Sequence, residues 1–331
     1  MANLALPRNF QLNEYKISRK LSSGGFSIVY LAYTKHGMPV AIKEFFPNNL
    51  HLRSKGQSVD FINSRERSRF LSGLRAFKDE TEIVMRLKHK NIIEIIDFFE
   101  MNGTAYIVMP YEYGCTLSKF IALEKNLQET EIVNIITGIF EAVHMFHENG
   151  IIHLDLKPGN IWLRPNKDAL ILDFGTARIL NDEEKKKEPP MYTPGYAAPE
   201  QHKELFQPAR IGVWTDYYGL GATLYAMIEK KSAPPSPDYI LNGTKVDIKN
   251  ERLGQFNTLL LEIIEYLMTP EWDKRKKINL LDVIDRMKKI KSHTPPSTII
   301  SHFDELQLEG FSIFKNSLNQ SPILFKKKKI I

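Results

Sequence analysis

The sequence HLDLKPGNIWLRPNKDALILDFG, residues 153–175, carries Asp155, Asn160 and Asp173 around what its pattern predicts to be a β-hairpin. Two apolar, strand-like segments in it, NIWL and ALIL, are separated by the turn-like sequence RPNKD. Because a hairpin brings its two ends together, Asn160 and Asp173 are expected to lie side by side. Their carboxylate and amide oxygens suit Mg²⁺, which takes one or two carboxylates together with waters and substrate phosphates. Asp155 is a further carboxylate that this metal site does not need.

The order of motifs along the chain resembles that of the protein kinase family. Residues 153–160, HLDLKPGN, resemble the catalytic loop, and residues 173–175 match the magnesium-binding DFG. Further matches lie at workable distances, with AIK upstream at residues 41–43 and YTPGYAAPE downstream at residues 192–200. The sequence around PVAIKEFF and YTPGYAAPEQ looks most like that of bacterial members of the eukaryotic-like (Hanks-type) serine/threonine kinases. The resemblance covers about residues 15–290.

The resemblance implies a two-lobed α+β fold, with a five-stranded antiparallel sheet and one main helix in the N-terminal lobe and a mostly helical C-terminal lobe. Hydrophobic patterns agree with it, because amphipathic spacing predicts helices at residues 74–87, 129–147, 259–268 and 280–290. The expected organisation is an N-terminal extension at 1–14, a kinase domain at 15–291 with lobes at about 15–109 and 114–291, an insertion at about 47–72, and a C-terminal tail of unknown role at 292–331.

Composition limits the class of protein. A chain of 331 residues with 43% hydrophobic residues can fill substantial cores, and the single Cys115 excludes an intramolecular disulfide. There is no apolar run of about 18 residues and no signal-like N-terminus, so a soluble, cytoplasmic protein is expected. The net charge of +6 is partly local to Lys326–Lys329. That run is expected to be solvated, with contact to an anionic membrane as the minor alternative, and no nucleic-acid partner is expected. The sequence does not indicate the oligomeric state.

The family's catalytic roles can be carried over to matching positions of this sequence. Asp155 would orient a substrate hydroxyl and accept its proton, and Lys157 would steady the γ-phosphate. Asn160 and Asp173 would hold Mg²⁺, or Mn²⁺, bound with ATP. Thr193 falls in the substrate-docking loop, and together with Lys157 it favours serine or threonine as the acceptor.

Nucleotide contacts are implied in the N-terminal lobe and the hinge. Lys43 would bind the α- and β-phosphates and pair with Glu80, which lies nine residues before His89, whereas Glu82 is the alternative partner. Three departures from the family pattern are Ser22 and Ser27, which replace glycines, and Pro110, which removes a hinge amide. The residues expected to contact ATP are Leu21, Ser22, Ser23, Gly24, Gly25, Phe26, Ser27, Val29, Ala41, Lys43, Met109, Tyr111, Glu112 and Thr116.

Some positions resemble the family's structural contacts. Asp216 opens an apolar helix, like the aspartate that anchors the catalytic-loop backbone. Arg275 falls where an arginine pairs with the glutamate of APE, here Glu200. His153 is expected to pack against Phe174.

The expected function is therefore transfer of the ATP γ-phosphoryl group to serine or threonine hydroxyls of protein substrates. A pseudokinase acting as a binding scaffold is one alternative, suggested by the altered glycine-rich loop and by Pro110. The charged residues Lys43, Asp155 and Asp173 are all present, which argues against it. A small-molecule phosphotransferase of related fold is another alternative, but such enzymes lack this docking loop and its terminal APE.

Overall fold

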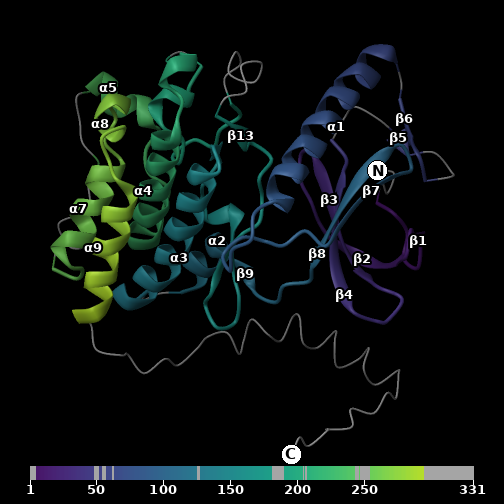
Figure 1. The fold of residues 1–331 in the computed structure, drawn as a ribbon, viewed down its shortest axis with the longest axis horizontal. Helices are drawn as coiled ribbons and strands as arrows, with labels where there is room; N and C mark the ends of the chain where they lie inside the picture. Colours follow the sequence, from purple (N-terminus) through teal and green to yellow (C-terminus); the bar gives the residue numbers. More distant parts are fainter. Residues whose placement is uncertain are drawn as a thin grey trace, which may run out of the picture.

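The computed structural model of the chain describes residues 5–293, except 48–51, 54–56, 62, 125–126, 181–189, 204, 206, 243–245 and 247–253. A lobe built on a sheet and a lobe built of helices lie side by side (Figure 1). The tail from residue 294, including Lys326–Lys329, lies outside the described residues. Among the helices that are described, none is long and apolar enough to cross a lipid bilayer.

The N-terminal sheet has six antiparallel strands in the order β1-β2-β3-β4-β8-β7, so the prediction of five strands was wrong by one. The additional strand β1 comes from the predicted N-terminal extension, where Leu12 pairs with Tyr15 and is fully buried. Asn13, with φ of 51°, turns the chain back between β1 and β2. A strand of two residues has too short a pattern to be predicted from the sequence. The strands are β1 (Gln11–Leu12), β2 (Tyr15–Ser23), β3 (Ser27–Tyr33), β4 (Pro39–Phe45), β7 (Asp97–Met101) and β8 (Thr104–Pro110).

The strand β4 explains how Lys43 reaches the space between the lobes. Val40, Ile42 and Glu44 are buried on one face of the strand, whereas Ala41 and Lys43 are half-buried on the other. Because side chains alternate across a strand, a lysine at this position points away from the core of the sheet. Its neighbours Val29 on β3 and Ile107 on β8 fix the register.

The predicted insertion at residues 47–72 includes regular secondary structure. It contains a short hairpin, β5 (Leu52–Arg53) and β6 (Val59–Asp60), but its last residues already belong to helix α1 (Ser64–Met85). Asn63 caps this helix, because its side chain accepts a hydrogen bond from the Glu66 amide. The first turns of α1 are polar and bury only Phe70, which is why the apolar pattern predicted a start at Leu74.

The chain that leads into β7 contacts the C-terminal lobe. Only Asp97–Met101 form β7, since the preceding segment bonds to the C-terminal lobe instead. Ile93 donates its amide to the Ile171 carbonyl, and the Ile171 amide bonds to the Asn91 carbonyl. The segment therefore ties the two lobes together.

A buried ion cluster fastens the β5–β6 hairpin to the back of the sheet. The Glu44 carboxylate has no exposed surface and accepts hydrogen bonds from Tyr30 Oη at 2.6 Å, Tyr106 Oη at 2.8 Å and Arg53 Nη2 at 2.8 Å. The Arg53 guanidinium also lies 4.4 Å from the centre of the Phe46 ring. Full pairing offsets the cost of burying the carboxylate.

We expect Arg53→Met to lower the free energy of unfolding by about 3 to 5 kcal/mol, because it leaves the buried Glu44 carboxylate without its cation. Chemical denaturation of the purified protein measures the loss. The matched control removes an exposed ion pair of similar length, Lys274–Glu271 at 2.7 Å, through Lys274→Met, and should leave the free energy of unfolding nearly unchanged. If both substitutions lowered the free energy of unfolding equally, Arg53 would not have the stabilising role given to it here.

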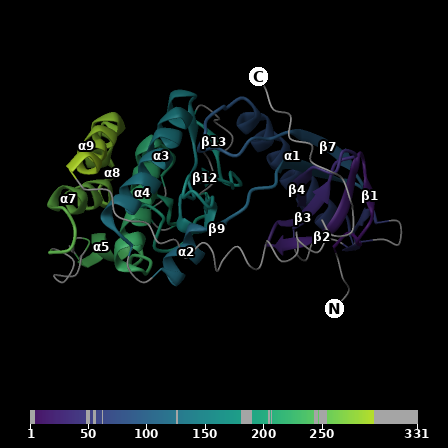
Figure 2. The same cartoon turned by 90° about the horizontal axis from the view of Figure 1, so that it is seen from below.

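The C-terminal lobe is built around α4, an apolar helix that is buried along almost its whole length. Figure 2 shows α3 and α4 between α7 and α9 on one side and β12 and β13 on the other. The helices predicted in this lobe are present with slightly shifted ends. The elements are α2 (Leu117–Leu123), α3 (Glu129–Glu148), α4 (Val213–Glu229), α5 (Ser236–Asn242), α7 (Thr258–Leu267), α8 (Trp272–Arg275), α9 (Leu280–His293), β9 (Cys115–Thr116), β10 (Ile151–Ile152), β11 (Ile161–Leu163), β12 (Ala169–Ile171), β13 (Arg178–Ile179) and the 3-10 turns η1 (Pro158–Asn160), η3 (Pro199–Gln201) and η4 (Pro208–Arg210).

Candidate active site

The hairpin predicted within residues 153–175 is present. Strands β11 and β12 pair antiparallel, with Ile161 opposite Ile171. The Leu172 amide continues the pairing by donating to the Asn160 carbonyl at 3.0 Å. The residue after this pair is Asp173, so the hairpin brings Asn160 and Asp173 to one end of the ladder, as the sequence indicated.

A cavity of about 490 Å³ lies between the lobes and collects most of the predicted site. The predicted residues that line it are Gly24, Gly25, Phe26, Ser27, Lys43, Glu80, Asp155, Lys157, Asn160, Asp173 and Thr193. Lining residues that sequence reasoning missed are Phe45, Gly73, Ala76, Phe77, Gly175, Thr176, Met191 and Tyr192. Ala76 and Phe77 were within reach of a sequence argument, because helical spacing places them one turn before Glu80.

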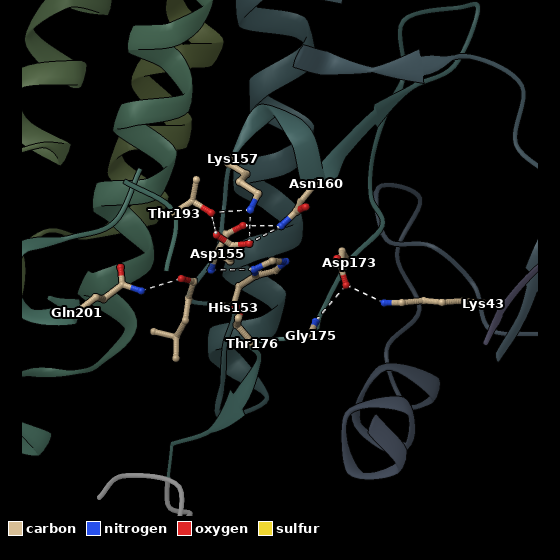
Figure 3. Close-up of polar contacts among 11 residues, drawn as sticks. Lys43, His153, Asp155, Lys157, Asn160, Asp173, Gly175, Thr176, Thr193 and Gln201 are labelled. Carbon is tan, nitrogen blue, oxygen red and sulfur yellow. Dashed lines mark hydrogen bonds and ion pairs between the residues drawn. The ribbon is translucent and has the colours of Figure 1, made fainter. Parts of the chain in front are cut away.

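The Asp155 carboxylate is the centre of a hydrogen-bonded cluster, shown in Figure 3. It accepts bonds from Lys157 Nζ at 2.6 Å and Asn160 Nδ2 at 2.9 Å on Oδ2, and from Thr193 Oγ1 at 2.8 Å on Oδ1. Lys157 Nζ also donates to Thr193 Oγ1 at 2.6 Å. The cluster therefore holds a carboxylate, an ammonium group and a hydroxyl together at the cavity wall.

A second charged pair joins the two lobes across the cavity. Lys43 Nζ lies 2.8 Å from Asp173 Oδ1, although 130 residues separate them in the chain. Burial alone would lower the pKa of the Lys43 ammonium, but the charges of Asp173 and Glu80 outweigh it and raise that pKa. The Lys43 charge in turn lowers the pKa of the Asp173 carboxyl to about 2. Both groups are therefore ionised at neutral pH.

The oxygens of Asn160 and Asp173 fit a magnesium ion. Asn160 donates both of its hydrogen bonds from Nδ2, to the Asp155 carbonyl and carboxylate, which leaves Oδ1 on the opposite side of the amide. The Asp173 side chain is about half exposed at 48%, so it can accept a ligand from solvent. An ionised carboxylate and an amide oxygen are hard ligands of the kind that Mg²⁺ binds.

The structure favours Glu80 over Glu82 as the acidic partner of Lys43. Glu80 is buried on α1 and lines the cavity, and its negative charge contributes to the raised pKa of Lys43. Glu82 is exposed and does not line that cavity. The side of the helix that faces the cleft therefore carries the expected carboxylate.

The remaining residues expected to bind ATP do not line this cavity: Leu21, Ser22, Ser23, Val29, Ala41, Met109, Tyr111, Glu112 and Thr116. Ala41 and Met109 are cross-strand neighbours, and both are half-buried. Thr116 caps α2 by accepting a hydrogen bond from the Lys119 amide. The adenine contacts of these residues stay a prediction.

The hinge after β8 is held by the C-terminal lobe. The Glu112 carboxylate accepts two bonds from the Arg164 guanidinium, at 2.8 and 2.7 Å. Gly114 has φ of 138°, and a side chain there would meet the Leu163 carbonyl oxygen at 1.8 Å, so only glycine fits. The hinge therefore approaches β11 backbone to backbone.

Asp216 anchors the catalytic-loop backbone, as its sequence context implied. It accepts the amides of His153 at 2.8 Å and Leu154 at 2.7 Å, and it lies 2.9 Å from His147 Nε2. Gln201 Nε2 donates to the Leu154 carbonyl at 2.7 Å. Leu154 has φ of 67°, so these bonds hold a backbone conformation that is unfavourable for leucine.

Two further expected contacts are present. The Arg275 guanidinium bonds both Glu200 oxygens at 2.5 Å in a fully buried pair. The His153 and Phe174 rings have centres 5.5 Å apart. Glu200 and Phe174 are thus both held by contacts within the C-terminal lobe.

Comparison with known proteins agrees with this geometry. Residues 15–298 match the family described as "Protein kinase domain". The chain belongs to the protein kinase family. The prediction of the family and its fold is confirmed, apart from the additional strand β1.

The relatives include kinases of bacteria and animals. PrkC, a serine/threonine-protein kinase of Bacillus subtilis, is 30% identical over 65% of this chain and 30% of its own length. A probable serine/threonine-protein kinase of Lactococcus lactis, PknB, is 30% identical over 65% of this chain and 31% of its own length. The probable serine/threonine-protein kinase zyg-1 of Caenorhabditis briggsae is 27% identical over 83% of this chain and 34% of its own length. The chain spans about a third of the length of these relatives.

A solved structure has the same fold. The apo form of PpkA-294 superimposes with a TM-score of 0.74 and is 27% identical, and the match covers 87% of this chain and all of that one. The two-lobed arrangement in Figure 1 is therefore that of a protein kinase.

Proposed function

We propose that the chain transfers the ATP γ-phosphoryl group to serine or threonine hydroxyls of protein substrates. The observation that carries this proposal is the Asp155 cluster with Lys157 and Thr193, which shares one cavity with the Lys43–Asp173 pair. Phosphoryl transfer needs alignment and charge neutralisation more than covalent help. The Asp155 cluster would supply the alignment, and the Lys43–Asp173 pair would supply the charge neutralisation.

Asp155 positions the acceptor in this proposal. Its Oδ1 already accepts a hydroxyl hydrogen bond from Thr193, and a substrate hydroxyl placed beside it would donate in the same way and lose its proton to the carboxylate. Lys157, 2.6 Å from Asp155, would place its positive charge next to the phosphoryl group in transfer. The Thr193 hydroxyl contacts both Asp155 and Lys157, so it would be close enough to hold a serine or threonine acceptor in line.

Lys43, Asn160 and Asp173 bind the nucleotide in this proposal. Lys43 would leave Asp173 and contact the phosphates of ATP, and the oxygens of Asp173 and Asn160 would hold Mg²⁺ or Mn²⁺. The ion, when bound, neutralises charge on the triphosphate. Convergence of Lys43, Asp155 and Asp173 on one cavity favours an enzyme over a pseudokinase scaffold. A cytoplasmic location stays a prediction.

The test is a transfer assay with the purified protein. Labelled ATP with Mg²⁺ or Mn²⁺ and a generic protein acceptor should give phosphoserine or phosphothreonine, which mass spectrometry can locate. A protein that binds ATP but transfers no phosphate to itself or to any acceptor under these conditions contradicts the proposal.

We expect basal activity that does not require phosphorylation of the activation loop. In many kinases a phosphorylated loop residue is bound by an arginine before the catalytic aspartate, but that position is Leu154, which is buried. Residues 177–191 contain no serine, threonine or tyrosine, and the charges of residues 181–188 nearly cancel. Residues 181–188 all lie outside the described residues. Control would then reside elsewhere, in the insertion, the tail or a partner.

Phosphatase-treated enzyme, checked by mass spectrometry, provides the measurement. It should phosphorylate a generic acceptor from the first minutes. A lag that prior incubation with ATP abolishes would refute this expectation. Thr193 is not a suitable site for the test, because it bonds directly to Asp155.

A further inference from the structure

The N-terminal half of α1 carries four exposed arginines. Arg65, Arg67, Arg69 and Arg75 are all exposed, and within the first 13 residues of the helix only Glu66 opposes them. None of the four side chains makes a hydrogen bond or ion pair with the part of the chain that the structure describes. Lys78, further along the same helix, differs because it pairs with Glu100 at 2.6 Å.

These arginines do not stabilise the helix. The amino end of a helix carries partial positive charge and favours acidic side chains, so a cation in its first turn, such as Arg65, is unfavourable. Arg65 and Arg69 are also four residues apart, a spacing at which like charges repel. Their presence therefore needs an explanation outside the helix itself.

The helix places two of the four arginines on the side that faces the cleft. Gly73, Ala76 and Glu80 line the cavity and mark that side of α1. Arg69 precedes Gly73 by four residues and Ala76 by seven, and Arg65 precedes Arg69 by four, so both continue the same face. Arg69 is one turn, about 6 Å along the axis, beyond the cavity wall. Figure 1 shows α1 running beside the sheet from β6 toward the helical lobe.

The opposite wall of the same cavity is the docking loop. Met191, Tyr192 and Thr193 line it, and Thr193 contacts Asp155. A protein segment that reaches Asp155 through this cavity is bounded by this loop and by α1. Its neighbouring residues then come within reach of the charged face of the helix.

We propose that Arg65 and Arg69, which we call the arginine stripe, select acceptor segments that carry an acidic or phosphorylated side chain near the accepting hydroxyl. This inference rests on the proposed protein kinase activity. Guanidinium groups bind carboxylates and phosphates through two parallel hydrogen bonds, and both ligands share this oxyanion chemistry. The groups of the stripe are exposed, and binding an oxyanion would break none of the contacts that they make with the described residues.

The test compares acceptor peptides that differ at one flanking position. Each contains the same serine, with glutamate, phosphoserine, glutamine or lysine placed in turn at every position up to five residues on either side. We expect kcat/KM for the best glutamate or phosphoserine peptide to exceed that of its glutamine counterpart by about three- to tenfold. The preference should shrink as salt is added, because the stripe is exposed to solvent.

Two double variants distinguish an effect of the arginine stripe from a general effect of positive charge on the helix. Arg65→Gln with Arg69→Gln should abolish the preference while leaving kcat/KM for the glutamine peptide unchanged. Arg67→Gln with Arg75→Gln removes the same charge from other sides of the same helix and should retain the preference. Because the stripe opposes the helix dipole, its removal should not lower the unfolding temperature.

The outcomes separate this inference from the proposed function. If all peptides are phosphorylated without a charge preference, the stripe does not select acceptors, and the kinase activity stands. The same holds if both double variants lose the preference equally. No phosphorylation of any peptide or protein acceptor overturns the proposed function itself. Preference for glutamate, phosphoserine or both, lost only in the stripe variant, supports the inference.

Discussion

Asp155→Asn should lower the rate of phosphoryl transfer by about two to four orders of magnitude, the usual span for removal of a positioned base. Asparagine keeps the size of the side chain and can still accept a hydrogen bond from Thr193 or Lys157. It cannot take up the proton of a substrate hydroxyl. The fold should therefore persist while the chemical step fails.

Single-turnover transfer from labelled ATP measures the loss, and circular dichroism with thermal unfolding checks the fold. Asp168→Asn is the matched control, because Asp168 is an exposed aspartate in the turn at the other end of the same hairpin. The control should retain normal transfer. If Asp155→Asn also transfers phosphate at nearly the parent rate, Asp155 is not the base.

Asp173→Ala should abolish magnesium-dependent binding of nucleotide, whereas Lys43→Met should mainly slow transfer. Asp173 provides the ionised carboxylate beside Asn160, and the metal is the largest local charge in such a site. Loss of Asp173 is therefore at least as damaging as loss of Lys43. Each substitution also leaves the other member of the 2.8 Å pair without its partner.

Titration of a nucleotide with and without Mg²⁺ separates the two residues. The parent protein should bind more tightly when the metal is present. Lys43→Met should keep part of that enhancement, and Asp173→Ala should show none. An Asp173→Ala protein whose nucleotide affinity still increases with Mg²⁺ contradicts the assignment of the metal ligand.

The sequence alone determined the local parts of the site. The strand-turn-strand pattern predicted that Asn160 and Asp173 would meet, because hairpin geometry depends on residues close together in the chain. Alternation along β4 likewise fixed the side from which Lys43 points. Motif order then gave the family, since each motif reports a local backbone shape and the chemistry attached to it.

Tertiary structure alone decided the contacts between residues far apart in the sequence. Strand β1 belongs to the sheet because pairing with β2 buries Leu12. Two residues are too few to show a periodic pattern, so the sequence did not predict this strand. The length of α1 was hidden because its first turns pack through little more than Phe70. The burial of Glu44 became apparent only with Arg53 and two tyrosines around it, since an acidic residue in a strand is usually exposed. The Lys43–Asp173 pair depends on how the lobes approach each other, and local sequence patterns do not encode that approach.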